Sequence, residues 1–200
     1  MARILLLFAH PSLEKSRVHA TMLKQVQQMP DVFINDLYQQ YPFFDIDINR
    51  EQQLLLAHDV FIFQHPLYWY SSPAIVKQWQ DLVLEHGWAY GKNGRMLEGK
   101  KIFHVITSGG KAESYKKDGF NAYSIQEFLR PVERTARLCR MEYWPPYVIH
   151  GTHRMNDIDI NVQATTYARF LSALRDDKIL TADAEAVTYL NQLLTITASL

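Results

Sequence analysis

Aromatic and imidazole side chains are concentrated in the segment Phe63–Pro73, which reads FQHPLYWYSSP. The apolar run Val60–Phe63 at its start predicts a short strand that is buried on both faces. The residues that follow predict a helix with Ser72 as its N-cap and Pro73 at its first position. Rings on a loop between a strand and a helix offer faces on which a flat cofactor can stack. Because open α/β sheets bind ligands at the carboxyl ends of their strands, this loop is a candidate cofactor site.

A second candidate segment follows the apolar run Ile4–Phe8 and leads into a predicted helix. Its polar and flanking side chains are His10, Ser16, Arg17, Val18 and His19. The helix N-terminus, the Ser16 hydroxyl and the positive charge could together hold a phosphate. The alternative is an N-capped surface turn whose histidine is satisfied within the protein.

A third segment ends the fourth predicted strand with Thr107, Ser108, Gly109 and Gly110. Paired glycines let a backbone approach a ligand closely and expose amide donors to a polar ring edge, although alone they more often indicate a plain turn. In a sheet of order 2-1-3-4-5, the ends of strands 1, 3 and 4 lie beside the switch point. A phosphate site, aromatic faces and an amide-lined edge in one pocket match flavin mononucleotide (FMN).

Strand-like and helix-like segments alternate along the chain. The predicted pairs are 4–8 with 16–28, 32–36 with 49–57, 60–63 with 73–84, 101–106 with 124–138, and 143–149 with 157–174. Five such units predict an α/β fold, a flavodoxin-like doubly wound five-stranded parallel sheet of order 2-1-3-4-5 with helices on both faces.

No repeat or linker divides the sequence, so we expect residues 1–200 to form a single flavodoxin-like domain with a C-terminal helical tail over 176–200. Within that tail, an amphipathic final helix is predicted by Ala184, Val187, Leu190, Leu193 and Leu194.

Composition excludes several classes of function. Lys plus Arg and Asp plus Glu are equal at 21 each, so no net charge favours nucleic acid. The single cysteine, Cys139, suits a reducing cytoplasm and excludes a thiolate metal cluster within one chain. His150 and His153 have metal-ligand spacing but lack carboxylate or thiolate partners, so no metal is expected. There is no dinucleotide fingerprint, phosphate-binding Walker loop or serine-hydrolase elbow.

The sequence also resembles the flavodoxin-like NAD(P)H quinone oxidoreductases and, within that family, the ancillary subunits of the Kef glutathione-gated potassium-efflux systems. The similar blocks cover most of the first 150 residues and are 8–11 (FAHP), 36–38 (DLY), 41–42 (YP), 45–48 (DIDI), 64–70 (QHPLYWY), 87–91 (GWAYG) and 129–131 (LRP).

The resemblance implies a homodimer with bound FMN that takes hydride from NADH or NADPH. It then passes two electrons, by a ping-pong mechanism, to a quinone or another small electrophilic acceptor. His10 and residues 16–19 would hold the phosphate, and Thr107 to Gly110 would meet the pyrimidine edge. The ring and ribityl chain would pack on Pro66, Leu67, Tyr68, Trp69 and Tyr70. Tyr70 and Tyr115 are the candidates for a hydrogen bond to the acceptor oxygen or the flavin edge.

A different class of function remains as an alternative. The chain would then be a non-catalytic regulatory subunit that docks on a membrane transporter and activates it, through the aromatic-rich loops 37–48 and 85–99. We expect a cytoplasmic protein, which such a partner would hold at the inner face of the cell membrane. Members of the family often carry Asn in the turn that here holds Arg17, Val18 and His19.

Overall fold

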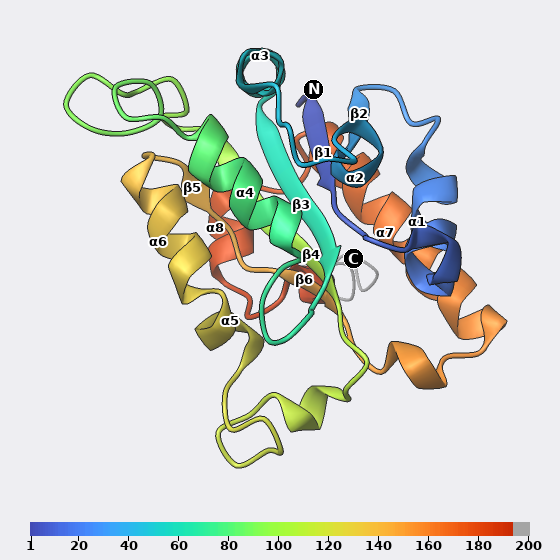
Figure 1. Ribbon diagram of the computed structural model, residues 1–200. Coiled ribbons are helices and arrows are strands. Elements are labelled where there is room, and N and C mark those ends of the chain that lie inside the picture. The colour runs from blue at the N-terminus through green and yellow to red at the C-terminus, as the bar shows by residue number, and fades with distance from the viewer. Residues whose placement is uncertain (194–200) are drawn as a thin grey trace.

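The structure is a computed structural model in which residues 1–193 are described, and its centre is a parallel sheet (Figure 1). The strands are β1 (Ile4–Phe8), β2 (Val32–Asp36), β3 (Val60–Pro66), β4 (Lys101–Thr107), β5 (Glu142–Tyr143) and β6 (Tyr147–Ile149). Their order is β2-β1-β3-β4-β5, and β6 also pairs with β4. All residues of β1 and β3 are buried, as expected for central strands covered on both faces. The fold class and strand order predicted from the sequence are confirmed.

The fifth strand position differs from the prediction because two short strands share it. β5 pairs with the beginning of β4, and β6 pairs with its end. Between them stand Pro145 and Pro146, which have no backbone N–H to donate to a neighbouring strand. The single strand predicted over 143–149 is therefore interrupted.

Helices cover both faces of the sheet (Figure 1). On one face lie α1 (Arg17–Val26) and α7 (Asp157–Arg175), and on the other lie α3 (Ile48–Ala57), α4 (Ala74–Val83) and α6 (Arg130–Leu138). The short elements are α2 (Leu37–Gln40), α5 (Ile125–Phe128), α8 (Thr181–Glu185), η1 (Leu13–Lys15), η2 (Ala112–Ser114), η3 (Thr152–Arg154) and η4 (Leu190–Gln192). Ile4 and Leu6 of β1 enter the first core, while Leu5 and Leu7 enter the second. None of the helices in the described part of the chain has the length and apolar character needed to cross a membrane.

Two predicted helix boundaries are wrong. Pro73 is the N-cap of α4, with ψ of 150°, so the helix begins one residue later and Ser72 does not cap it. The helix predicted over 124–138 is divided into α5 and α6 at Leu129, which has ψ of 1°. Pro131 follows within two residues, and its missing N–H cannot continue the hydrogen bonds of α5.

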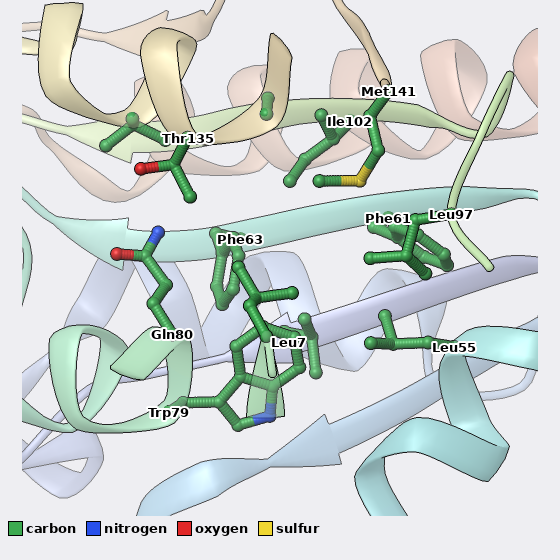
Figure 2. Close-up of a pocket in the computed structure, with 13 residues that line it drawn as sticks. Leu7, Leu55, Phe61, Phe63, Trp79, Gln80, Leu97, Ile102, Thr135 and Met141 are labelled. Atoms are coloured by element: carbon green, nitrogen blue, oxygen red, sulfur yellow. The ribbon is translucent and has the colours of Figure 1, made fainter. Parts of the chain in front are cut away.

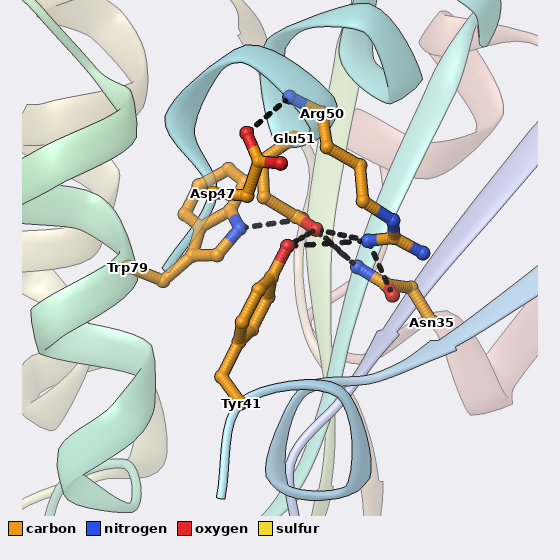
Figure 3. A network of polar contacts seen from close by, with 6 residues as sticks. All are labelled: Asn35, Tyr41, Asp47, Arg50, Glu51 and Trp79. Atoms are coloured by element: carbon orange, nitrogen blue, oxygen red, sulfur yellow. Dashed lines mark hydrogen bonds and ion pairs between the residues drawn. The ribbon is translucent and has the colours of Figure 1, made fainter. Parts of the chain in front are cut away.

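The buried carboxylate of Glu51 connects β2, α3, α4 and the segment that contains Tyr41 (Figure 3). Glu51 of α3 is completely buried and accepts hydrogen bonds from Asn35 of β2, Tyr41, Arg50 and Trp79 of α4. The Tyr41 and Arg50 bonds measure 2.6 and 2.5 Å, and the Trp79 bond measures 2.8 Å. Every lone pair of the carboxylate thus has a donor, which is the condition under which a buried charge is tolerated.

The chain after α7 returns to the sheet as two short helical elements, α8 and η4, instead of the one helix predicted. Tyr189 between them is extended, with φ of −134° and ψ of 136°. Leu190 and Leu193 are buried in the first core, and the Asn191 side chain bonds both the N–H and the C=O of Val148 at 2.7 and 3.0 Å. The tail is therefore tied to the outer edge of β6. Leu194, also predicted in this helix, lies outside the described residues.

A largely apolar pocket lies between the sheet, α4 and α6, lined by Trp79, Phe63 and Met141 among others (Figure 2). Its volume of about 10 Å³ is that of a single water molecule. This space is a packing defect of the core and cannot hold a cofactor.

Candidate functional site

The loops that follow β1, β3 and β4 meet at the carboxyl edge of the sheet, as predicted. Backbone hydrogen bonds join them, from Ala9 N–H to Gln64 O at 2.9 Å and from Leu67 N–H to Thr107 O at 2.8 Å. They enclose a cleft of about 540 Å³, here called the α1 cleft. Its lining residues are His10, Ser12, Lys15, Ser16, Arg17, Val18, Pro66, Leu67, Tyr68, Thr107, Gly109, Thr152 and His153.

One end of the α1 cleft is the N-terminus of α1. Ser16 is the N-cap, and its hydroxyl accepts the N–H of His19 at 3.2 Å. The N–H groups of Arg17 and Val18, in the first turn, have no partner within the helix. Together with Lys15, they make this end of the cleft suitable for an anion.

Arg17 lines the α1 cleft, as predicted, but its guanidinium is bound to α7 and to the segment before it. Its guanidinium donates to Asp157 at 2.5 Å and to the carbonyl of Met155 at 3.1 Å. The side chain borders the cleft, but its charge is compensated by α7. Arg17 therefore joins the starts of α1 and α7 and leaves the anion site to backbone N–H groups, Ser16 and Lys15.

His19 is also placed differently from the prediction. Its side chain is 1% exposed and does not line the cleft. Burial and the neighbouring His10 and His65 hold the pKa of His19 well below its ordinary value of 6.5. The ring contacts Thr107 Oγ1 through Nε2 at 2.9 Å and Gln64 Nε2 through Nδ1 at 3.2 Å. A neutral, enclosed imidazole of this kind is no phosphate ligand.

His10 lies on the floor of the α1 cleft beside Tyr68, with 6.1 Å between the ring centroids. Its Nδ1 accepts the N–H of Ser12 at 3.1 Å, so the proton of the neutral ring is on Nε2. Desolvation lowers the pKa of His10, opposed by Glu14. His10 is thus a neutral donor at neutral pH.

The predicted aromatic loop forms a tight turn. Tyr68 and Ser71 exchange backbone hydrogen bonds of 3.0 and 2.9 Å, and both central residues have positive φ, 49° at Trp69 and 62° at Tyr70. The turn separates its rings, because Tyr68 lines the α1 cleft while Trp69 is 93% exposed. Tyr70 packs against Phe128, with ring centroids 5.1 Å apart.

A second cleft, of about 330 Å³ and here called the aromatic cleft, adjoins the first at Leu67. Its lining residues are Leu67, Trp69, Tyr70, Gly110, Ser114, Tyr115, Phe120 and Asn121. The two tyrosines predicted to contact an acceptor, Tyr70 and Tyr115, are both here. The site residues therefore divide between two adjoining clefts, where the sequence had predicted one pocket.

Two neighbouring rings pack closely against the glycine pair. A Cβ on Gly109 would lie 2.3 Å from the ring of His153, and one on Gly110 would lie 3.2 Å from the hydroxyl of Tyr115. The preceding residue, Ser108, is buried, and its hydroxyl donates to Gly110 O and pairs with His150. Ser108 thus stabilises the turn through these hydrogen bonds and lines neither cleft.

Sequence reasoning did not single out Lys15 within the second segment, and it missed two lining residues of the α1 cleft outside the three segments, Thr152 and His153. His153 was considered only as one half of a metal-binding pair, whereas the structure places its ring against Gly109. Among residues 1–193, no group of His, Cys, Asp and Glu is arranged to hold a metal ion. The positive φ of Gly151 at the start of this loop is the local feature that turns His153 toward the cleft, and the Gly-Thr-His sequence alone does not specify it.

Comparison with known proteins places the chain in one family. Residues 2–171 match the family model described as flavodoxin-like fold. The glutathione-regulated potassium-efflux system ancillary protein KefG of Cronobacter sakazakii is 44% identical over 171 residues, which are 86% of this chain and 93% of that protein.

Two solved structures are also similar. General stress protein 14 of Treponema denticola, in complex with FMN, has 38% identity and a TM-score of 0.82, covering 86% of this chain and 99% of that one. An NADPH-quinone reductase from P. pentosaceus has 28% identity and a TM-score of 0.76, covering 84% and 96%. With these relatives, the chain belongs to the flavodoxin-like NAD(P)H quinone reductase family, as its residues predicted.

Proposed function

We propose that the protein is an FMN-dependent NAD(P)H:quinone oxidoreductase with FMN in the α1 cleft. The observation that carries the proposal is the meeting of a helix N-terminus whose Arg17 and Val18 N–H groups have no partner in the helix, a tyrosine face and a glycine turn in one cleft of about 540 Å³. The similar structure from Treponema denticola is a complex with FMN and supports this assignment.

The residues of the α1 cleft fit the parts of FMN. Arg17 and Val18 N–H, the Ser16 hydroxyl and Lys15 would bind the phosphate. Pro66, Leu67 and Tyr68 would pack along the ring and ribityl chain. Thr107 and Gly109, together with Gly110 of the adjoining aromatic cleft, would meet the pyrimidine edge. The lack of a side chain on Gly109, where a Cβ would meet His153 at 2.3 Å, leaves its backbone accessible to a ring.

Bound FMN supplies hydride acceptance from NADH or NADPH and two-electron delivery to a quinone. The aromatic cleft beside it would hold the nicotinamide and then the quinone in turn, which is the basis for a ping-pong order. Tyr115 and Tyr70, which both line that cleft, would donate hydrogen bonds to the acceptor oxygen. Trp69 and Phe120 would limit access of water, since flat apolar rings border the same space.

The visible absorption spectrum of the protein, after incubation with FMN and desalting, tests the proposal. We expect flavin to be retained, to bleach on addition of NADPH and to recover on addition of a soluble quinone. Initial rates at several fixed quinone concentrations should give parallel double-reciprocal lines for the ping-pong order. Protein that leaves the column without flavin contradicts the proposal.

A second function, as ancillary subunit of a potassium-efflux transporter, is favoured by the 44% identity to KefG. Phe43, in the loop predicted to dock, is 87% exposed. The two roles are separated by Tyr115→Phe and Phe43→Ser, tested for quinone turnover and for efflux from cells with a Kef transporter. A docking role requires that Phe43→Ser lowers efflux while quinone turnover is kept. We also propose a homodimer, which light scattering after size-exclusion chromatography would detect.

A further inference from the structure

A chain of buried hydrogen bonds leads from α7 to the wall of the α1 cleft. Tyr167 donates from its hydroxyl to Gln64 Oε1 at 2.9 Å. Gln64 Nε2 lies 3.2 Å from His19 Nδ1, and His19 Nε2 lies 2.9 Å from Thr107 Oγ1. Tyr167, Gln64 and His19 are buried, and Thr107 is the member that lines the cleft.

The donor and acceptor roles along this chain of hydrogen bonds follow from Tyr167, at its buried end. In the reverse direction the Gln64 amide would donate to Tyr167, and the Tyr167 proton would have no acceptor among the described residues. A buried donor without a partner is costly, so the Tyr167 hydroxyl donates and Gln64 Nε2 must also donate. His19 Nδ1 then accepts, and the neutral ring carries its proton on Nε2. Consequently Thr107 accepts from His19, and its own hydroxyl proton is free.

The free proton of Thr107 is at the one place in the chain where a ligand can use it. No hydrogen bond recorded among residues 1–193 has the Thr107 hydroxyl as donor. The low pKa of His19 agrees with a ring that stays neutral in this position. The one hydroxyl proton of this chain of hydrogen bonds that has no acceptor is therefore at Thr107 in the cleft, and not in the core, where it would lower stability.

We propose that His19 is a positioning residue, held as the Nε2–H tautomer by Gln64, that leaves the Thr107 hydroxyl proton free to donate a hydrogen bond to an oxygen of the bound ligand. For this chain the ligand is FMN, so the second half of the inference rests on the proposed function. Thr107 then offers a donor to an acceptor atom of the ligand at its position.

The tautomer can be tested without any ligand. In two-dimensional ¹⁵N–¹H NMR of protein with labelled histidine, we expect the His19 signals of an unprotonated Nδ1 and a protonated Nε2 at neutral pH. His19→Gln identifies the resonances. A proton on Nδ1, in a neutral or a doubly protonated ring, shows that Nδ1 does not accept from Gln64 and overturns the inference.

The role of the chain in binding is tested by FMN affinity, measured by fluorescence quenching. Thr107→Val should weaken FMN binding roughly 3- to 10-fold, the effect of one hydrogen bond, and Thr107→Ser should restore it. His19→Leu should weaken binding similarly, and His19→Leu with Thr107→Val should be no weaker than Thr107→Val alone. Additive losses, or equal affinities for the Val and Ser variants, contradict the inference.

Tyr167→Phe serves as a second route if His19→Leu does not fold, because it frees the Gln64 amide and keeps the core volume. It too should add no loss in the Thr107→Val background. The two arms separate the possible failures. A wild-type protein that binds no FMN contradicts the proposed function, whereas the NMR spectrum still reports the direction of the chain.

Discussion

Buried histidines are the residues whose ionisation the fold constrains most strongly. His65 and His104 are completely buried and joined by a hydrogen bond of 2.8 Å from ring to ring. His65 Nδ1 also contacts Pro66 O at 2.9 Å, so His65 Nε2 accepts and His104 Nδ1 donates. His104 Nε2 is left without a partner, which leaves the pair no compensation for a positive charge.

Stability should therefore fall as the pH is lowered through the histidine range. Burial lowers the pKa of His65 from 6.5 to about 4 and lowers those of His19 and His104 well below 6.5. As the pH falls below 6.5, these histidines bind protons in the unfolded chain but stay neutral in the folded chain. The part of the unfolding free energy that they contribute above pH 6.5 is therefore lost progressively toward pH 4. For His65 alone the loss at pH 4 is about 3 kcal/mol. Urea unfolding at several pH values measures it, and a free energy that is constant between about pH 7 and pH 5 contradicts it.

The contact between Gly109 and His153 predicts a specific substitution effect. Gly109→Ala places a methyl group 2.3 Å from the His153 ring, which is exposed and must swing into the α1 cleft or away from it. We expect FMN affinity to fall roughly 10-fold while the unfolding free energy changes by less than about 1 kcal/mol. In a His153→Ala background the same substitution should have little effect on affinity. An equal loss in both backgrounds shows that the backbone, not the ring, is responsible.

At the scale of elements, the turn 68–71 combines two aromatic residues with positive φ. Such residues cost roughly 1–2 kcal/mol each in this conformation, and proteins retain them where the geometry serves a site. Trp69 contributes almost no burial in return. The conformation does separate Tyr68, which lines the α1 cleft, from Trp69 and Tyr70, which line the aromatic cleft.

Replacing Trp69 by Asn tests whether the turn is strained. Asn tolerates positive φ, so Trp69→Asn should raise the unfolding free energy by about 0.5–1 kcal/mol. The KM for quinone should rise, because Trp69 lines the aromatic cleft. Phe120→Asn is the matched control, since Phe120 is 92% exposed and has no positive φ. A gain in stability of the same size in both variants means that exposure of an aromatic ring, not strain, is the cause.

The helices, strands and loops could largely be predicted from the sequence, whereas the directions of side chains could not. The strands and long helices follow from apolar periodicity, and the convergence of three loops follows from the strand order. Directions of side chains could not be predicted, because they depend on partners far away in the chain. Arg17 turns to Asp157, 140 positions later, and His19 turns to Thr107, 88 positions later. The interrupted fifth strand was predictable in principle, from Pro145 and Pro146.

For the whole molecule, Glu51 is the point at which β2, α3, α4 and the loop 37–48 are joined (Figure 3). The loop proposed to dock on a partner is thus fixed to the core through Tyr41. An intact carboxylate is needed, because an amide at this position would direct its own N–H groups at donors.

Glu51→Gln should lower the unfolding free energy by roughly 2–4 kcal/mol, because buried donors lose a charged acceptor. Glu98→Gln is the control, since Glu98 pairs with Arg95 at the surface, where solvent screens such a pair and its contribution to stability is small. Chemical denaturation of both variants near neutral pH provides the measurement. A loss for Glu51→Gln no larger than the control would show that the network is not a source of stability.

The attachment of the tail to β6 bears on how the molecule behaves in a crowded solution. The Asn191 amide fills both backbone positions at Val148 that an incoming strand from another molecule would use. Removing the chain from residue 186 onward would expose the unpaired edge of β6 together with the apolar surface now covered by Leu190 and Leu193. Shortened chains should then associate edge to edge into insoluble polymers, so residues 186–193 cover a sheet edge through which such polymers would grow.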